Sequence, residues 1–128
     1  MTHKTFKINQ HALLKSSTNK ILILRQGGRW MLPGGRVEGV GSPEEELKRE
    51  IKEETGIECF RVEGIVGVGV SSSGNTFLVT YKVKVDGEPQ VKISEEHTDY
   101  AWVDKESIGS YDFWHDTNKK KIASYLEE

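Results

Sequence analysis

Four glutamates with the chemistry of a metal site lie within one short stretch of the chain. At about 100° per residue of an α-helix, Glu50, Glu53 and Glu54 share an arc of about 100°, and Glu46 lies one turn earlier on the same side. Like charges at this spacing repel one another. A hard divalent cation would relieve the repulsion, because Mg²⁺ and Mn²⁺ bind carboxylate oxygens together with substrate phosphates. The helix by itself is equally compatible with a solvated surface, since charge runs are usually exposed.

A glycine-rich turn precedes this stretch and favours the metal-site interpretation. The residues Leu32-Pro33-Gly34-Gly35 predict a break in regular structure, where glycines let the backbone approach a ligand closely. A Gly-Gly pair alone is weak evidence, but beside an acidic helix it indicates a site for a phosphate compound.

The two features together resemble the Nudix box, whose pattern is G-x5-E-x7-R-E-U-x-E-E-x-G-U with U an apolar residue. Gly35 is followed after thirteen residues by Arg49–Ile57, which reads REIKEETGI. The lead-in Trp30–Gly35 (WMLPGG) is also typical of Nudix hydrolases. Weaker similarity continues through Glu95-Glu96-His97 and Ala101-Trp102-Val103 to the last helix, so the resemblance covers most of the chain.

One position departs from the pattern. The first glutamate of the box is replaced by Gly41, with the spacing preserved. In the family this glutamate supports the geometry of the loop and helix and helps to hold metal, so its loss deprives Arg49 of a usual neighbour. Glu38 is the nearby carboxylate that could compensate, and Gly41→Glu is expected to raise activity or metal affinity if it does not.

The resemblance implies roles for the intact box residues. Glu50 and Glu54 would bind Mg²⁺ or Mn²⁺, with a contribution from the Gly34 carbonyl. Glu53 would bind the metal, directly or through water, or activate the nucleophile. Arg49 would orient the glutamates through charge-assisted hydrogen bonds.

The general base is assigned from the same resemblance. Some family members use a glutamate on a loop after the central strands, and Glu96 is the choice here because it directly precedes His97. A solvated acidic loop is the equally weighted alternative. His97 itself is expected to pack or to bond locally.

Substrate contacts are predicted at Gly35, Phe113 and Asn118. The C-terminal segment resembles MutT-type Nudix enzymes, in which an asparagine at the place of Asn118 reads an oxidised guanine. The favoured alternative makes Asn118 the N-cap of the last helix. Phe113 is a candidate for stacking on a base, although aromatic residues are more often part of a core. Cys59 is interpreted as a small hydrophobic residue in a strand.

The elements that position these residues follow from periodicity and capping signals. The box helix is expected to begin after Ser42 and Pro43 and to end at Gly56. A second helix is predicted over 117–126. Strand patterns are predicted over 4–15, 21–24, 30–32, 62–70, 76–85 and 98–103, and a capped helical turn over 104–107. We therefore expect a single α/β domain over residues 1–128, and the resemblance specifies the Nudix α/β/α sandwich, a mixed sheet between two helices.

Composition excludes several other classes. The chain has 128 residues, a net charge of −2 and one cysteine, which argues against a nucleic-acid binder, a disulfide framework and, with no long apolar run, a membrane protein. The first ten residues lack the pattern of a secretory signal, so a cytoplasmic protein is expected. Because Nudix proteins often dimerise, a homodimer is one expectation.

The predicted activity is Mg²⁺-dependent hydrolysis of a nucleoside diphosphate derivative. A (deoxy)nucleoside triphosphate, cleaved to monophosphate and pyrophosphate, is the preferred substrate. The alternatives are hydrolysis of ADP-ribose or of a dinucleoside polyphosphate, and a non-catalytic nucleotide-binding module with a degenerate box.

Overall fold

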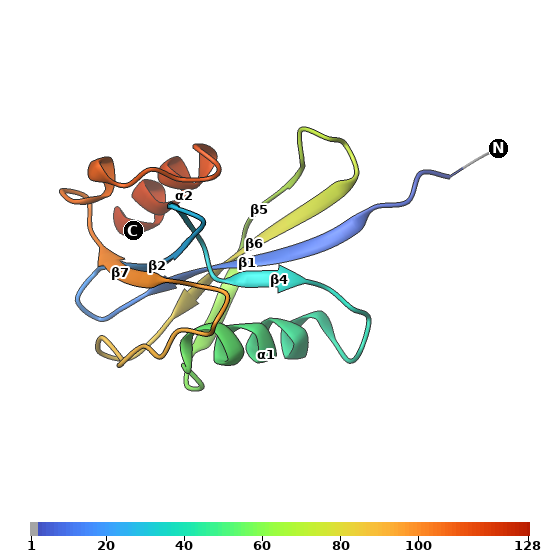
Figure 1. The fold of residues 1–128 in the computed structure, drawn as a ribbon. Helices are drawn as coiled ribbons and strands as arrows, with labels where there is room; N and C mark the ends of the chain where they lie inside the picture. Colours follow the sequence, from blue (N-terminus) through green and yellow to red (C-terminus); the bar gives the residue numbers. More distant parts are fainter. Residues whose placement is uncertain (1–2) are drawn as a thin grey trace.

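The computed structural model describes residues 3–128, and in this range a sheet lies between two α-helices (Figure 1). Met1 and Thr2 of the predicted domain lie outside the described residues. The elements in chain order are β1 (Lys7–Lys15), β2 (Ile21–Gln26), β3 (Arg29–Met31), β4 (Gly34–Arg36), α1 (Pro43–Thr55), β5 (Arg61–Val70), β6 (Thr76–Lys84), β7 (Asp99–Val103), the 3₁₀ helix η1 (Ile108–Ser110) and α2 (Thr117–Leu126).

The sheet is mixed, as predicted. Its strands run in the order β3-β2-β1-β6-β5, with β4 also paired to β1 and β7 paired to β2. The β1–β6 pair is parallel and the other pairs are antiparallel. β1 therefore lies at the centre, and β4, which leads into the box helix, is hydrogen-bonded to it.

The central strands are buried on both faces and so supply two cores. Ala12 and Leu14 of β1 pack with Leu47 and Ile51 of α1. Leu13, between them in sequence, packs with residues of α2 in the second core. This alternation is the two-residue period of a strand, and it produces the predicted α/β/α sandwich.

Helix α1 begins and ends where local signals predict. The Ser42 hydroxyl accepts a hydrogen bond from the Glu45 amide, and the Glu45 carboxylate accepts one from the Ser42 amide, which completes a capping box. Gly56 closes the helix at φ 76°, a left-handed conformation that glycine adopts readily. A chain from Tyr81 through Gln10 to the Pro43 carbonyl, with both bonds 2.8 Å long, ties the start of α1 to β6 and β1.

Three local predictions are wrong. Asn118 is not the N-cap of α2: Asp116 holds that position, without a side-chain capping bond, and Asn118 is a buried residue of the first turn. Gly34 does not interrupt the sheet but opens β4, because β1 offers a free strand edge there. Cys59 is exposed and precedes β5 rather than lying within a strand. The other predicted strands, the turn at 104–107 and the span of α2 are confirmed within a few residues.

No α-helix within residues 3–128 is long and apolar enough to cross a membrane.

His11 of β1 makes the stability of the fold sensitive to pH. Burial, with the positive charges of Lys121 and His115, lowers its pKa from 6.5 to about 4. The unfolded chain therefore takes up this proton first as the pH falls through 6.5, and the contribution to stability is lost progressively towards pH 4. We expect His11 to reduce the free energy of unfolding by about 1–2 kcal/mol between pH 7 and pH 5.

Urea unfolding of the wild type and of His11→Gln at both pH values measures this contribution. The pKa of Glu54 is raised to about 8, so Glu54 changes the free energy of unfolding with pH in the opposite direction. This effect is the same in both proteins, and the difference between them therefore isolates His11. An identical pH dependence in the two proteins would contradict the assignment.

Candidate active site

The three box glutamates differ in burial across the face of α1. The Glu54 residue is 6% exposed, whereas the side chains of Glu50 and Glu53 are 19% and 56% exposed. The acidic face thus begins against the core and ends in solvent. Among these three carboxylates, Glu53 is the most accessible from solvent and Glu54 is the least.

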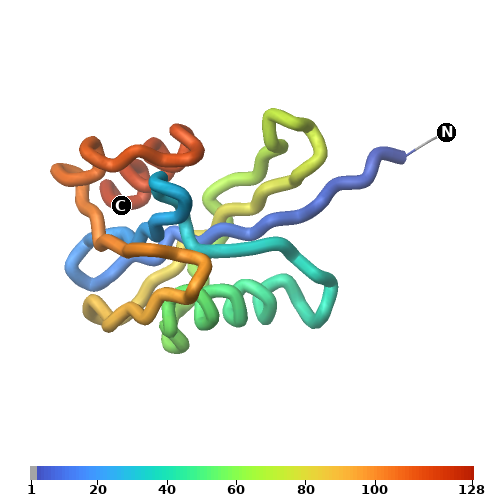
Figure 2. The backbone as a smooth tube through the Cα atoms, in the orientation of Figure 1, coloured from blue at the N-terminus to red at the C-terminus, as the bar shows by residue number. Residues whose placement is uncertain are grey.

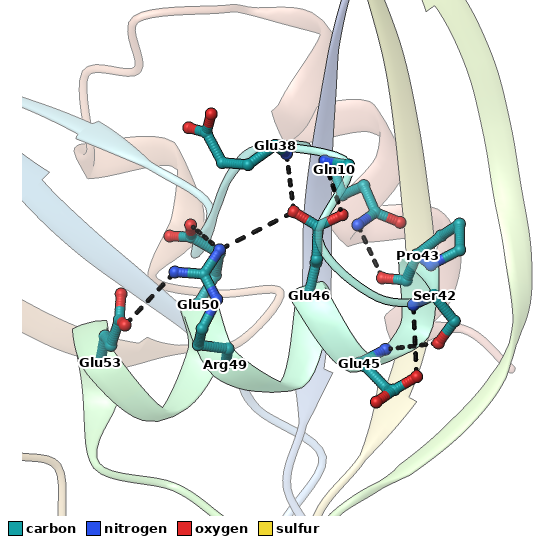
Figure 3. Close-up of polar contacts among 10 residues, drawn as sticks. Gln10, Glu38, Ser42, Pro43, Glu45, Glu46, Arg49, Glu50 and Glu53 are labelled. Atoms are coloured by element: carbon teal, nitrogen blue, oxygen red, sulfur yellow. Dashed lines mark hydrogen bonds and ion pairs between the residues drawn. The ribbon is translucent and has the colours of Figure 1, made fainter.

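Arg49 lies between these carboxylates and pairs with several of them (Figure 3). Its guanidinium is 3.4 Å from the Glu53 carboxylate and 3.4 Å from that of Glu50. A third carboxylate, that of Glu46, is 3.8 Å away. Arg49 therefore contacts three carboxylates, and the glycine at position 41 does not leave it without partners.

Glu54 is held against β4 by the backbone. The Gly34 amide donates a 2.8 Å hydrogen bond to Glu54 Oε1. Burial nevertheless raises the pKa of Glu54 to about 8, because one amide does not replace its hydration, and the negative charges of Glu50 and Glu96 add to this increase. Burial also raises the pKa of Glu50, despite the nearby Arg49 charge.

The two glycines of β4 allow the strand and α1 to lie this close. A Cβ added at Gly34 would be 2.0 Å from the Gln10 carbonyl oxygen, and one added at Gly35 would be 2.5 Å from Glu50 Oε2. Gly34 is therefore required by its contact with the backbone of the sheet, whereas a side chain at position 35 would displace the Glu50 carboxylate of the acidic face. Figure 2 shows the chain continuing from β4 through a loop into α1.

Glu96 lies near enough to the acidic face for its charge to influence the carboxylates there. Its negative charge helps to raise the pKa of both Glu50 and Glu54. The segment that carries it is fixed to the end of α1 by a hydrogen bond from the Lys92 amide to the Thr55 carbonyl. The adjacent His97 is buried, with Nδ1 3.4 Å from Ser94 Oγ, which agrees with the local role predicted for it.

The donor set fits a hard divalent cation. Glu50, Glu53 and Glu54 supply only oxygen ligands, and burial raises the pKa of Glu50 and Glu54, with a further contribution from neighbouring carboxylates. Within residues 3–128, no three Asp, Glu, His or Cys side chains are arranged as a ready-made metal site. The hydrogen bonds instead direct Glu53 and Glu50 towards Arg49, and Glu54 towards the Gly34 amide.

The predicted substrate residues Asn118 and Phe113 lie on the other face of the sheet. Phe113 is 2% exposed and packs in the second core with Ile122 and Tyr125. Asn118 is likewise buried, in α2. The structure thus brings Gly35, but not these two residues, next to the box glutamates, and it gives Phe113 a packing role.

Sequence reasoning missed the structural importance of Glu46. This residue is placed on the acidic face by periodicity, yet its side chain is 2% exposed. The signal available in sequence was its position in the first turns of α1. In the structure it lies beneath the glycine-rich loop, which we define as residues 37–42 between β4 and α1. Gly41, in that loop, has φ 95°, so Gly41→Glu would introduce backbone strain, and the new Cβ would lie 3.8 Å from the Glu45 carboxylate.

Comparison with known proteins agrees with this fold. The family model of the NUDIX domain matches residues 6–126 of the sequence. A solved MutT protein from Methanosarcina mazei Go1 superposes with a TM-score of 0.77 and 25% sequence identity, over 99% of this chain and 96% of that chain.

Two curated relatives match about two thirds of the sequence. The nucleoside triphosphatase NudI of Klebsiella pneumoniae (strain 342) is 36% identical over 96 residues, which cover 66% of this chain and 68% of that protein. A Mycobacterium tuberculosis (strain CDC 1551 / Oshkosh) protein provisionally named 8-oxo-dGTP diphosphatase 2 is 34% identical over 89 residues, covering 67% of this chain but 61% of its own length.

These matches define the class of protein. The fold is a mixed sheet between two helices, and the box glutamates lie on one of these helices. The family model spans nearly the whole chain. The chain belongs to the Nudix family of pyrophosphohydrolases.

Proposed function

We propose that this Nudix enzyme hydrolyses a (deoxy)nucleoside triphosphate to the monophosphate and pyrophosphate, with Mg²⁺ or Mn²⁺ as cofactor. The observation that carries the proposal is the graded acidic face of α1, in which Glu54, Glu50 and Glu53 run from core to solvent beside a close-approaching glycine backbone. The name of the NudI relative supports the choice of substrate class.

The proposed ligands of the cation are Glu50, Glu53 and Glu54, with the Gly34 carbonyl. When bound, such a cation polarises a diphosphate oxygen and lowers the pKa of an attacking water. The role of Arg49 is to hold Glu50 and Glu53 in place through the contacts described above. Gly35, which has no side chain, lets the substrate phosphates approach the backbone.

We assign the general base to Glu96. This carboxylate removes a proton from the attacking water as the new P–O bond forms and the P–O bond to the pyrophosphate leaving group breaks. The assignment is supported by its electrostatic influence on Glu50 and Glu54.

Asn118 remains a proposed contact for the nucleobase of the substrate, and this contact requires a movement that exposes the Asn118 side chain. A homodimer and a cytoplasmic location also remain proposals.

The proposed reaction is tested by ³¹P NMR of nucleotides incubated with the protein. The panel contains dNTPs, 8-oxo-dGTP, ADP-ribose and diadenosine polyphosphates, each with Mg²⁺, with Mn²⁺ and with EDTA. We expect metal-dependent release of pyrophosphate from a triphosphate. Cleavage confined to ADP-ribose or a dinucleoside polyphosphate would replace the proposed substrate, and no cleavage of any compound would favour a nucleotide-binding module.

A further inference from the structure

The buried Glu46 carboxylate fastens the glycine-rich loop to α1. Its Oε1 accepts a 2.6 Å hydrogen bond from the Glu38 amide, and its Oε2 accepts a 3.2 Å bond from the Gly39 amide (Figure 3). A carboxylate buried this far from water is stable only when hydrogen bonds or cations replace its hydration. The two amides supply that replacement, so the loop and the helix are held in one arrangement.

The same carboxylate also contacts the residue that orders the acidic face. Oε1 of Glu46, which accepts the Glu38 amide, is 3.8 Å from Nη2 of Arg49. Nη2 is in turn 3.4 Å from Glu50, and Nη1 is 3.4 Å from Glu53. A continuous chain of polar contacts therefore runs from the loop through Glu46 and Arg49 to two of the proposed metal ligands.

Neither Gly41 nor Glu38 can supply this link. Gly41 has no side chain, and its φ of 95° disfavours any other residue. Glu38 contributes its backbone amide rather than its carboxylate, which points away from Glu46 and Arg49 in Figure 3. Glu46, which enters from the helix, is the carboxylate that meets both the loop and Arg49.

We propose that Glu46 is a positioning residue that replaces the missing first glutamate of the box. It holds the loop around Glu38 and Gly39 against α1, and it restrains Arg49 so that Glu50 and Glu53 keep their orientation. The part of this inference that concerns turnover rests on the proposed function, whereas the part that concerns the loop and metal affinity does not.

The test compares Glu46→Gln with the wild type and with Glu44→Gln, a matched control at an exposed glutamate in the first turn of α1. Glutamine keeps the size of the side chain but turns one of the two acceptors into a donor that faces a backbone amide. Three quantities are measured: kcat and KM, the Kd for Mn²⁺ alone, and the amide chemical shifts of Glu38 and Gly39.

We expect Glu46→Gln to shift both amide resonances upfield and to reduce Mn²⁺ affinity or kcat 10–100-fold, the range found when groups that orient metal ligands are removed. Glu44→Gln should leave all three quantities near their wild-type values. Unchanged amide shifts, Mn²⁺ affinity and kcat in Glu46→Gln would overturn the inference.

Three further outcomes have defined consequences. If Glu46→Gln does not fold, hydrogen exchange of the wild type decides: slow exchange of the Glu38 and Gly39 amides supports the bonds to Glu46, and fast exchange of both overturns them. If the wild type hydrolyses no nucleotide, the proposed function fails, while the amide and Mn²⁺ measurements still judge Glu46. If the wild type is active and Glu46→Gln matches it in all respects, only the inference fails.

Discussion

Glu53→Gln is expected to lower kcat by about 10²–10⁴ while the protein stays folded. The amide cannot carry the negative charge that metal binding or activation of water requires. Because the Glu53 side chain is 56% exposed, its substitution leaves no buried group without a partner, so stability should change little. Steady-state hydrolysis of the best nucleotide in the panel, together with thermal unfolding of the same samples, measures both effects.

Glu58→Gln is the matched control for this prediction. Glu58 is 62% exposed and forms an ion pair with Lys52 at 2.9 Å, much as Glu53 does with Arg49, but away from the acidic face. The loss of this surface pair should leave kcat unchanged. Equal rates for Glu53→Gln and the wild type would remove Glu53 from the proposed catalytic machinery.

Gly34→Ala is expected to destabilise the protein by about 3 kcal/mol or more, from roughly 1–3 kcal/mol of backbone strain and 1–3 kcal/mol of overpacking. Gly34 has φ 151°, and a Cβ would lie 2.0 Å from the carbonyl oxygen of Gln10, a backbone atom of the central strand that cannot move aside cheaply. β4 would have to separate from β1, which also disturbs the Gly34 amide that binds Glu54. Urea unfolding measures the loss.

Gly69→Ala is the corresponding control. Gly69 lies in β5 with open space where a Cβ would be placed and no left-handed φ, so the change in stability should stay within roughly 0.5 kcal/mol. If Gly34→Ala unfolds at the same urea concentration as the wild type, the close packing of β4 on β1 is not a requirement of the fold.

The helices were predictable because their signals are local. Ser42, Pro43 and Gly56 mark the ends of α1 through backbone hydrogen bonds and φ preferences that act within a few residues. The continuous apolar run at 21–24 likewise predicts a buried strand without reference to the rest of the chain. β4 was missed because Gly34 pairs only with the edge that β1 provides from more than twenty residues away.

The acidic face of α1 was predictable in composition but not in geometry. The spacing of Glu50, Glu53 and Glu54, with its resemblance to the Nudix box, identifies the acidic face and the family, and the family model confirms the latter. It does not show that Glu54 is buried and Glu53 exposed, since burial depends on how β1 and β4 pack on the helix.

The amino-acid sequence by itself therefore determined the ends of α1, the strand periods, the family and the spacing of the glutamates, because each depends on residue type and position along the chain. Only the tertiary structure decided that the charge of Glu96 helps to raise the pKa of Glu50 and Glu54, that Phe113 packs in a core, and that Glu46 lies beneath the loop. The physical reason is that burial and electrostatic neighbours arise from contacts between distant segments, and these contacts exist only once the sheet has brought the segments together.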